Sequence, residues 1–315
     1  MTSPPIVTTP RRPVHTYSVV ARDPVTGDLG CAVQSHWFNV GVIVVWAEPG
    51  VGAIATQSFA EPAYGPHGLE RMRAGTDAES VLAELTAADA EREVRQVAFV
   101  DASGRVAAHT GTGCIEAAGH EVGDGFSVQA NMMASAAVWP AMARAYRDGL
   151  ANLDLSDRLL AALTAAQEAG GDFRGAQSAA ILIVGGERTD RPWEATRVDL
   201  RVEDHTDPVG ELTRLLALQR AYDLMNKGDG AVAVGDWDRA LSDYAEAARR
   251  APQIVELPFW HAVALVNGGR TDEALPIFAD VFAREPRWRE AVGRLVRAGQ
   301  LPDDEALIAR ITADH

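Results

Sequence analysis

The sequence has few cysteines and little positive charge. Cys31 and Cys114 are the only cysteines among 315 residues, so we expect no disulfide framework, and a reducing, cytoplasmic compartment fits this usage. Lys and Arg total 29 against 44 Asp and Glu, a formal net charge of −15. Because phosphate contacts require clustered basic residues, this balance argues against a nucleic-acid partner or an anionic membrane surface. The sequence also has no apolar run long enough to cross a bilayer.

The common motifs of metal and cofactor sites are missing as well. No two of the 8 histidines have the i, i+4 spacing of a helical zinc site, and Cys-x-x-Cys does not occur. The chain has no G-x-S-x-G nucleophile elbow and no phosphate-binding G-x-x-x-x-G-K-[ST] loop. We therefore expect neither a metal nor a cofactor.

The first two thirds of the chain alternate strand and helix patterns. A leader at residues 1–15 is rich in Pro, Thr and Ser and shows no periodicity. A capping box, Thr76 with Glu79, predicts where one helix begins. The apolar runs "VIVVWA" and "AAILIV" predict strands covered on both faces, as in sheets packed between helical layers. The expected strands are 16–21, 29–35, 42–47, 51–57, two within 94–111, 125–132, 177–186 and 196–204, and the expected helices include 137–149 and 156–169.

The last third contains only helix signals and an internal repeat. Pro252 and Pro286 close two similar segments at a spacing of 34 residues, which is the period of tetratricopeptide repeats. We expect Trp237, Trp260 and Trp288 in this region to be packing residues. The positions that match at this spacing are Gly235 with Gly269, Ala240 with Ala274, Tyr244 with Phe278, and Ala247 with Val281.

Small neutral polar residues recur at the ends of the apolar strands. Hydroxyl and amide groups in such places suit a site that stabilises an oxyanion by hydrogen bonds, although the same residue types also cap ordinary strands. The residues concerned are Thr16, Gln34, Ser35, Thr56, Gln57, Ser58, Gln129, Asn131, Gln177 and Ser178.

The hydroxyl and amide residues at the strand ends include no general base, and Thr16 could supply one. The α-amine of a chain-terminal Thr has a typical pKa of about 7.7 to 8.0 and can take the proton of its own Oγ. This chemistry requires that residues 1–15 be removed. Ser18 is a weaker alternative nucleophile because it lies inside the strand.

Five blocks together resemble a known family: "TYSVVARDPVTGDLGCAVQSHWFNVG", "PGVGAIATQSFAEPAYGPHGLERMRAG", "RQVAFVDASGRVAAHTG", "GFSVQANMM" and "RGAQSAAILIV". They are similar to the microbial family called domain of unknown function 1028, which is grouped with the N-terminal-nucleophile hydrolases. The resemblance implies an α+β fold with a four-layer α-β-β-α sandwich over residues 16–203. It also implies hydrolysis of a small-molecule or peptide amide. Residues 204–315 would then form the tetratricopeptide-like repeats.

Site residues follow from the matched blocks. Thr16 corresponds to the strand-opening Thr and is the expected nucleophile. We place Asn131 in the oxyanion hole and expect Ser35 and Ser178 to orient the α-amine or a water. The expected substrate-binding residues are His36, Gln57, Tyr64 and Gln177. The short repeat stack favours a homo-oligomer or a protein partner bound through the repeats. The alternatives are a non-catalytic ligand-binding module that uses the same pocket, and a pure scaffold.

Overall fold

The computed structural model describes residues 16–313. The predicted leader, residues 1–15, lies outside the described residues. The chain divides into two compact units, residues 1–213 and 214–315, and the boundary falls within helix α6 (Pro208–Ala233).

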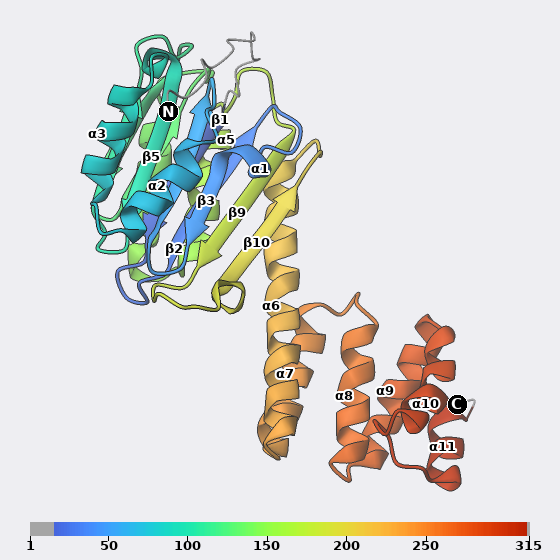
Figure 1. Cartoon of the computed structure of the whole chain (residues 1–315). Coiled ribbons are helices and arrows are strands. Elements are labelled where there is room, and N and C mark those ends of the chain that lie inside the picture. Colours follow the sequence, from blue (N-terminus) through green and yellow to red (C-terminus); the bar gives the residue numbers. More distant parts are fainter. Residues whose placement is uncertain (1–15, 314–315) are drawn as a thin grey trace. The chain divides into compact units, whose positions relative to one another are not determined.

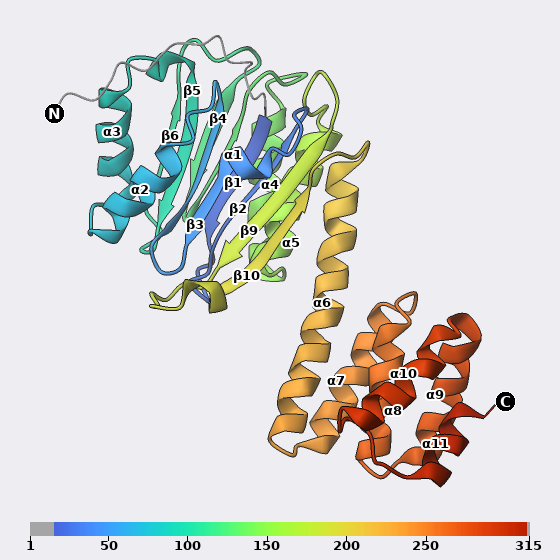
Figure 2. The same ribbon diagram turned by 45° about the vertical axis from the view of Figure 1, so that its right-hand side comes forward.

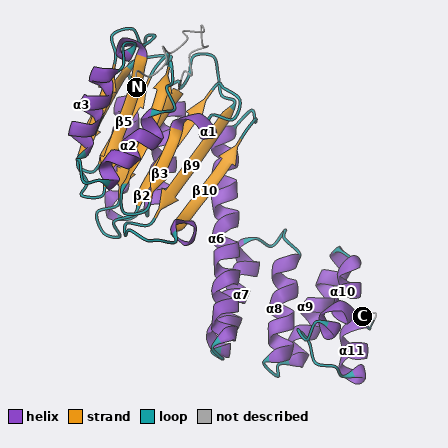
Figure 3. Ribbon diagram, viewed as in Figure 1, coloured by secondary structure: helices purple, strands orange, loops and turns teal. Residues whose placement is uncertain are grey.

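The first unit contains a six-stranded and a four-stranded antiparallel sheet (Figures 1 and 3). The strand order is β10-β9-β2-β1-β8-β7 in the larger sheet and β3-β4-β5-β6 in the smaller one. The strands are β1 (Thr16–Arg22), β2 (Leu29–Ser35), β3 (Val45–Glu48), β4 (Gly52–Ser58), β5 (Arg95–Asp101), β6 (Val106–Thr110), β7 (Gly119–Gly123), β8 (Phe126–Ala130), β9 (Ser178–Val184) and β10 (Thr196–Val202).

Helices cover the outer faces of both sheets. Helices α2 (Tyr64–Arg73) and α3 (Ala78–Ala88) pack on the smaller sheet, and α4 (Val138–Asp148) and α5 (Leu155–Glu168) pack on the larger one (Figure 2). Alternate residues of β4 therefore enter different cores: Ala55 faces the space between the sheets, whereas Ile54 faces α2 and α3. The expected mixed fold with antiparallel sheets is confirmed, and strands buried on both faces explain the long apolar runs.

Three local predictions were wrong. Residues 42–47 are not one strand, because helix α1 (Gly41–Val44) precedes β3. Gly41 lies close against β9, where a Cβ would come within 2.6 Å of Ala180 Cβ, so this position has room only for glycine. Strand β7 forms between the strands expected within 94–111 and at 125–132, where no strand was predicted. Asp77, not Thr76, caps α3, since its carboxylate accepts from the backbone N of Ser80 at 2.9 Å.

The C-terminal region is helical, as predicted. Positions 34 residues apart share the same environment: Ala240 and Ala274 are both fully buried, and Gly235 and Gly269 both adopt positive φ before a helix. Within the described residues, no helix combines the length and apolar character needed to cross a bilayer. The helices after α6 are α7 (Trp237–Arg250), α8 (Glu256–Asn267), α9 (Thr271–Arg284), α10 (Arg287–Arg297) and α11 (Glu305–Thr312).

Candidate active site

Four predicted site residues form one row across adjacent strands. Thr16, the first residue of β1, pairs with Ser35 in β2, and Ser35 pairs with Ser178 in β9. On the other side of Thr16, the backbone N of Asn131 donates to Thr16 O at 3.0 Å. Directly opposed residues of antiparallel strands carry their side chains on the same face of the sheet. The structure thus brings these four buried residues together at one end of the larger sheet.

The row faces the interior between the two sheets. Ser18 lies two residues beyond Thr16 in β1, so its side chain is on the same face. Its hydroxyl donates to Gln57 Oε1 on β4 of the smaller sheet at 2.6 Å, and Gln129 Nε2 donates to the Ser18 hydroxyl at 2.6 Å. The space beside Thr16 is therefore walled by both sheets.

Two amide side chains hold the carbonyl of Thr16. Gln57 Nε2 donates to Thr16 O at 3.1 Å, and Asn131 Nδ2 lies 3.4 Å from the same oxygen. Both amides also donate to Gln96 Oε1 on β5, at 2.7 and 2.9 Å. Gln96 is thus the acceptor on which the two donors around Thr16 converge. A side-chain amide in this position fixes the Thr16 backbone without carrying charge.

The network continues from Gln96 to a histidine. Gln96 Nε2 donates to Thr110 Oγ1 at 2.9 Å, and Thr110 Oγ1 lies 2.8 Å from His120 Nδ1. The Thr110 hydroxyl has a second lone pair and one proton, so it accepts from Nδ1–H in one tautomer of the ring and donates to a bare Nδ1 in the other. Burial and the neighbouring His109 lower the pKa of His120, which favours the neutral ring that can accept this bond.

Ser178 in the row and two predicted residues beside it have bonding partners of their own. The Ser178 hydroxyl donates to Trp37 O and accepts from Val40 N at 3.1 Å, so it fixes the segment that follows β2. The side chain of His36, in that segment, is exposed. Gln177 donates to Asp204 Oδ1 at 3.0 Å.

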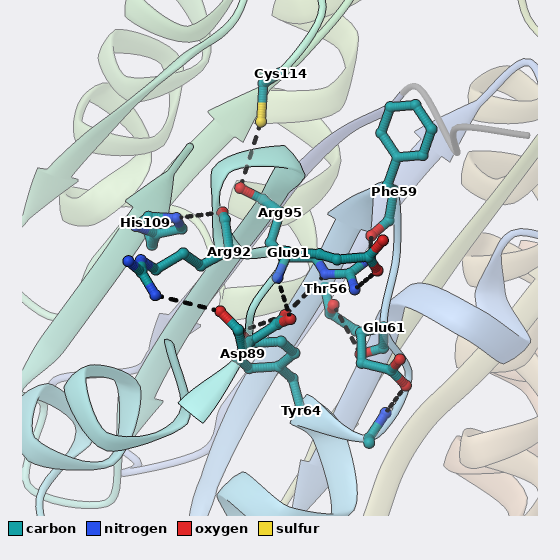
Figure 4. Close-up of polar contacts among 11 residues, drawn as sticks. Thr56, Phe59, Glu61, Tyr64, Asp89, Glu91, Arg92, Arg95, His109 and Cys114 are labelled. Atoms are coloured by element: carbon teal, nitrogen blue, oxygen red, sulfur yellow. Dashed lines mark hydrogen bonds and ion pairs between the residues drawn. The ribbon is translucent and has the colours of Figure 1, made fainter. Parts of the chain in front are cut away.

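Tyr64 is placed away from this row. It packs with Ile54 on the helix-covered face of the smaller sheet, whereas Gln57 is on the opposite face. Its hydroxyl donates to Asp89 Oδ2 at 3.1 Å (Figure 4). The structure therefore does not bring Tyr64 together with Thr16.

The Tyr64 contact belongs to an ion-pair network around Arg95. Arg95 is 4% exposed and donates to Asp89 Oδ2 at 2.9 Å, to Glu91 Oε2 at 2.6 Å and to Phe59 O at 2.6 Å (Figure 4). Burial alone would raise the pKa of Asp89, but hydrogen bonds from Arg95 and the Glu91 backbone outweigh it and lower that pKa. Because the Arg95 guanidinium bonds two carboxylates and one backbone carbonyl, we interpret this network as stabilising the fold.

The chemistry open to the Thr16 row follows from its neutral groups. Ser18, Gln57, Gln96, Gln129 and Asn131 carry no charge, so they can stabilise a carbonyl or oxyanion but cannot remove a proton. Within residues 16–313, no cluster of three or more His, Cys, Asp or Glu side chains is placed to hold a metal. A nucleophilic Thr16 would therefore need a base of its own.

Sequence reasoning missed Gln96 and Thr110. The available signal was a neutral amide next to the apolar run "VAFV" in the segment "RQVAFVD". Gln96 is directly opposite Gln57 in the β4–β5 pair, and two amides in register would have suggested a network.

The comparisons with known proteins concern the first unit and the start of α6. Residues 16–212 match a family described as "Family of unknown function (DUF1028)". The crystal structure of protein SPO2555 from Silicibacter pomeroyi, assigned to the same family, is similar at 31% sequence identity with a TM-score of 0.57. That similarity covers 64% of this chain and 88% of the other. No curated protein matches the sequence.

Proposed function

The chain belongs to the DUF1028 family, whose function is unknown, and from this premise we propose that it is an amidohydrolase with Thr16 as an N-terminal nucleophile. The observation that carries the proposal is the position of Thr16. It opens β1 between Ser35 and Asn131, and its carbonyl is held by the uncharged amides of Gln57 and Asn131. The two sheets packed between helical layers also support the proposal, because N-terminal-nucleophile hydrolases have this arrangement.

The proposed reaction begins with the removal of residues 1–15, which gives Thr16 a terminal α-amine. The α-amine takes the Oγ proton as Oγ attacks the acyl carbon of the amide. The oxyanion collapses, the C–N bond breaks, and the α-ammonium protonates the leaving amine. Water then attacks the acyl–Thr16 ester, with the α-amine again as base, and releases the acid.

Neighbouring residues have distinct roles in this scheme. Ser35, directly opposite Thr16, orients the α-amine. The Asn131 amide stabilises the oxyanion once it gives up its 3.4 Å contact with Thr16 O, the longer of its two bonds. Ser178 acts through the backbone of Trp37 and Val40, which shapes the wall beside Ser35. Gln57, His36 and Gln177 are the proposed substrate-binding residues.

We also propose that the helices after α6 are tetratricopeptide-like. Equal burial at positions 34 residues apart and glycines with positive φ before α7 and α9 support this interpretation. Such a unit would mediate self-association or bind a protein partner.

The test compares chains that differ only at the N-terminus and at residue 16. Intact-mass analysis first establishes whether the purified chain begins at Thr16. A chain released at Thr16 from a fusion is then assayed on a panel of chromogenic amides. We expect activity that Thr16→Ala reduces by about 1,000-fold or more and that Thr16→Ser partly retains. Thr26→Ala, in the turn at the far end of the same hairpin, is the matched control and should keep full activity.

Activity of an uncleaved chain that survives Thr16→Ala would overturn the proposal. A chain that keeps its leader, hydrolyses no amide and binds ligand equally well as Thr16→Ala would support the non-catalytic alternative.

A further inference from the structure

The helical unit contains an open cavity lined by aromatic rings. Its volume is about 480 Å³, and Trp237, Tyr244 and Trp260 contribute the rings. Met225 and Val263 add apolar surface. Asp229 is the only charged residue among the described residues that line it. A cavity of this size accepts a small molecule or one side chain of a partner.

A glycine inside α6 places Tyr244 and Asp229 together. Glycine costs roughly 1 kcal/mol relative to alanine in a helix interior. At Gly228 a Cβ would lie 2.9 Å from Tyr244 Cε1, so the missing side chain lets the ring approach α6. The Tyr244 hydroxyl donates to Oδ1 of the adjacent Asp229. Burial, together with this bond to Asp229, raises the pKa of Tyr244, so its ring remains a neutral phenol.

The Asp229 carboxylate has no cationic partner within the described part of the chain. Its Oδ1 accepts from Tyr244, and no described residue donates to its Oδ2. The cavity therefore combines an exposed carboxylate with three electron-rich aromatic rings.

The tryptophans of the unit divide into two groups. Trp288 packs against Phe259 with ring centroids 4.6 Å apart, as expected of a packing residue. Trp260 also touches Phe259, edge to face at 5.8 Å, but it is half-buried and lines the cavity as well. Trp237 lines the same cavity. Packing therefore does not account for all of the aromatic surface at Trp237 and Trp260.

We propose that this cavity binds an alkylammonium group, with a quaternary ammonium ion as the best fit. Aromatic faces attract cations, and methylated ammonium ions combine a diffuse positive charge with an apolar surface that suits Trp and Tyr rings. Asp229 supplies the opposite charge at the same cavity. An anion would be repelled by this carboxylate, and a neutral ligand would gain no charge attraction from it.

The experiment titrates the full chain with choline by calorimetry and compares 3,3-dimethylbutan-1-ol, its neutral carbon isostere. We expect saturable choline binding and at least about tenfold weaker binding of the neutral compound. Trp260→Leu and Asp229→Asn should each weaken choline binding about 3- to 20-fold. Trp193→Leu is the matched control, because Trp193 is an exposed tryptophan of the other unit, and it should leave binding unchanged.

Three results would overturn the proposal. They are no saturation with choline up to about 50 mM, equal binding of the neutral isostere, or equal losses in Trp193→Leu and Trp260→Leu. Asp229→Asn keeps the test decisive if Trp260→Leu does not fold, because the amide preserves an acceptor for Tyr244. Binding is measured directly and should be unchanged in Thr16→Ala, so the outcome is independent of the amidohydrolase proposal.

Discussion

Replacing Gln96 with Leu should severely destabilise the first unit. Gln96 is fully buried, and its Oε1 accepts one bond each from Gln57 and Asn131, at 2.7 and 2.9 Å. Leu has a similar volume but removes this acceptor, so Asn131 is left with one unpaired amide hydrogen and Gln57 with only a long contact, 3.4 Å to Gln129 O, in place of its 2.7 Å bond. A buried polar group left unpaired costs about 1 to 3 kcal/mol. Two such groups give an expected loss of roughly 2 to 6 kcal/mol in the free energy of unfolding.

The assay is urea unfolding of the full chain, followed by hydrogen exchange of peptides from β1, β4 and β5. This readout separates the first unit from the helical unit. Gln177→Leu is the matched control, since that amide is half-exposed and bonds only Asp204 with its side chain. It should cost no more than about 1 kcal/mol. Equal losses in the two variants would refute the buried network and, with it, our account of how Thr16 is held.

Two further predictions concern pH and helix packing. The pKa values of Asp23, Asp89 and Asp101 are lowered in the folded chain, against the effect of their burial. The unfolded chain therefore binds more protons, and stability should fall as pH drops below about 4. Urea midpoints at pH 3 to 6 should show this decline, and a smaller one in Asp89→Asn. In α6, Gly228→Ala should lower the melting temperature of the helical unit, because the added Cβ meets Tyr244. The Cβ added by Gly230→Ala meets nothing within 4 Å, so this variant should stabilise the unit by up to about 1 kcal/mol. A higher melting temperature in Gly228→Ala would contradict this view of the packing.

The fold was predictable where one signal dominated. Two strands were expected within residues 94–111, and Asp, Ser and Gly form the turn between them: Asp101 Oδ1 accepts from Ser103 N at 2.9 Å, and Gly104 adopts positive φ. The prediction of a single strand at residues 42–47 was wrong because it rested on β-branched residues, which favour a strand locally. The bond from Val40 N to Ser178 and the close approach of Gly41 to β9 are contacts between distant residues, and the local pattern does not include them. Such long-range contacts leave no periodicity in the sequence.

The site was predictable only in part, for a related reason. Thr16, Ser35 and Ser178 are polar residues at the ends of strands, and the register between strands brings them together. Tyr64 is close to Gln57 in sequence, yet the chain crosses from one face of the smaller sheet to the other between them. Gln96 stood alone in an apolar strand, so its importance emerged only from its partners on two sheets.

The most direct test of the central claim is to trap the acyl intermediate and locate it by mass spectrometry. A chain beginning at Thr16, quenched during turnover of an activated amide, should carry the acyl group on the peptide containing residues 16–22. The full-length chain and Thr16→Ala should carry none. An acyl group on another residue, or one that persists in Thr16→Ala, would contradict the assignment of Thr16 as the nucleophile.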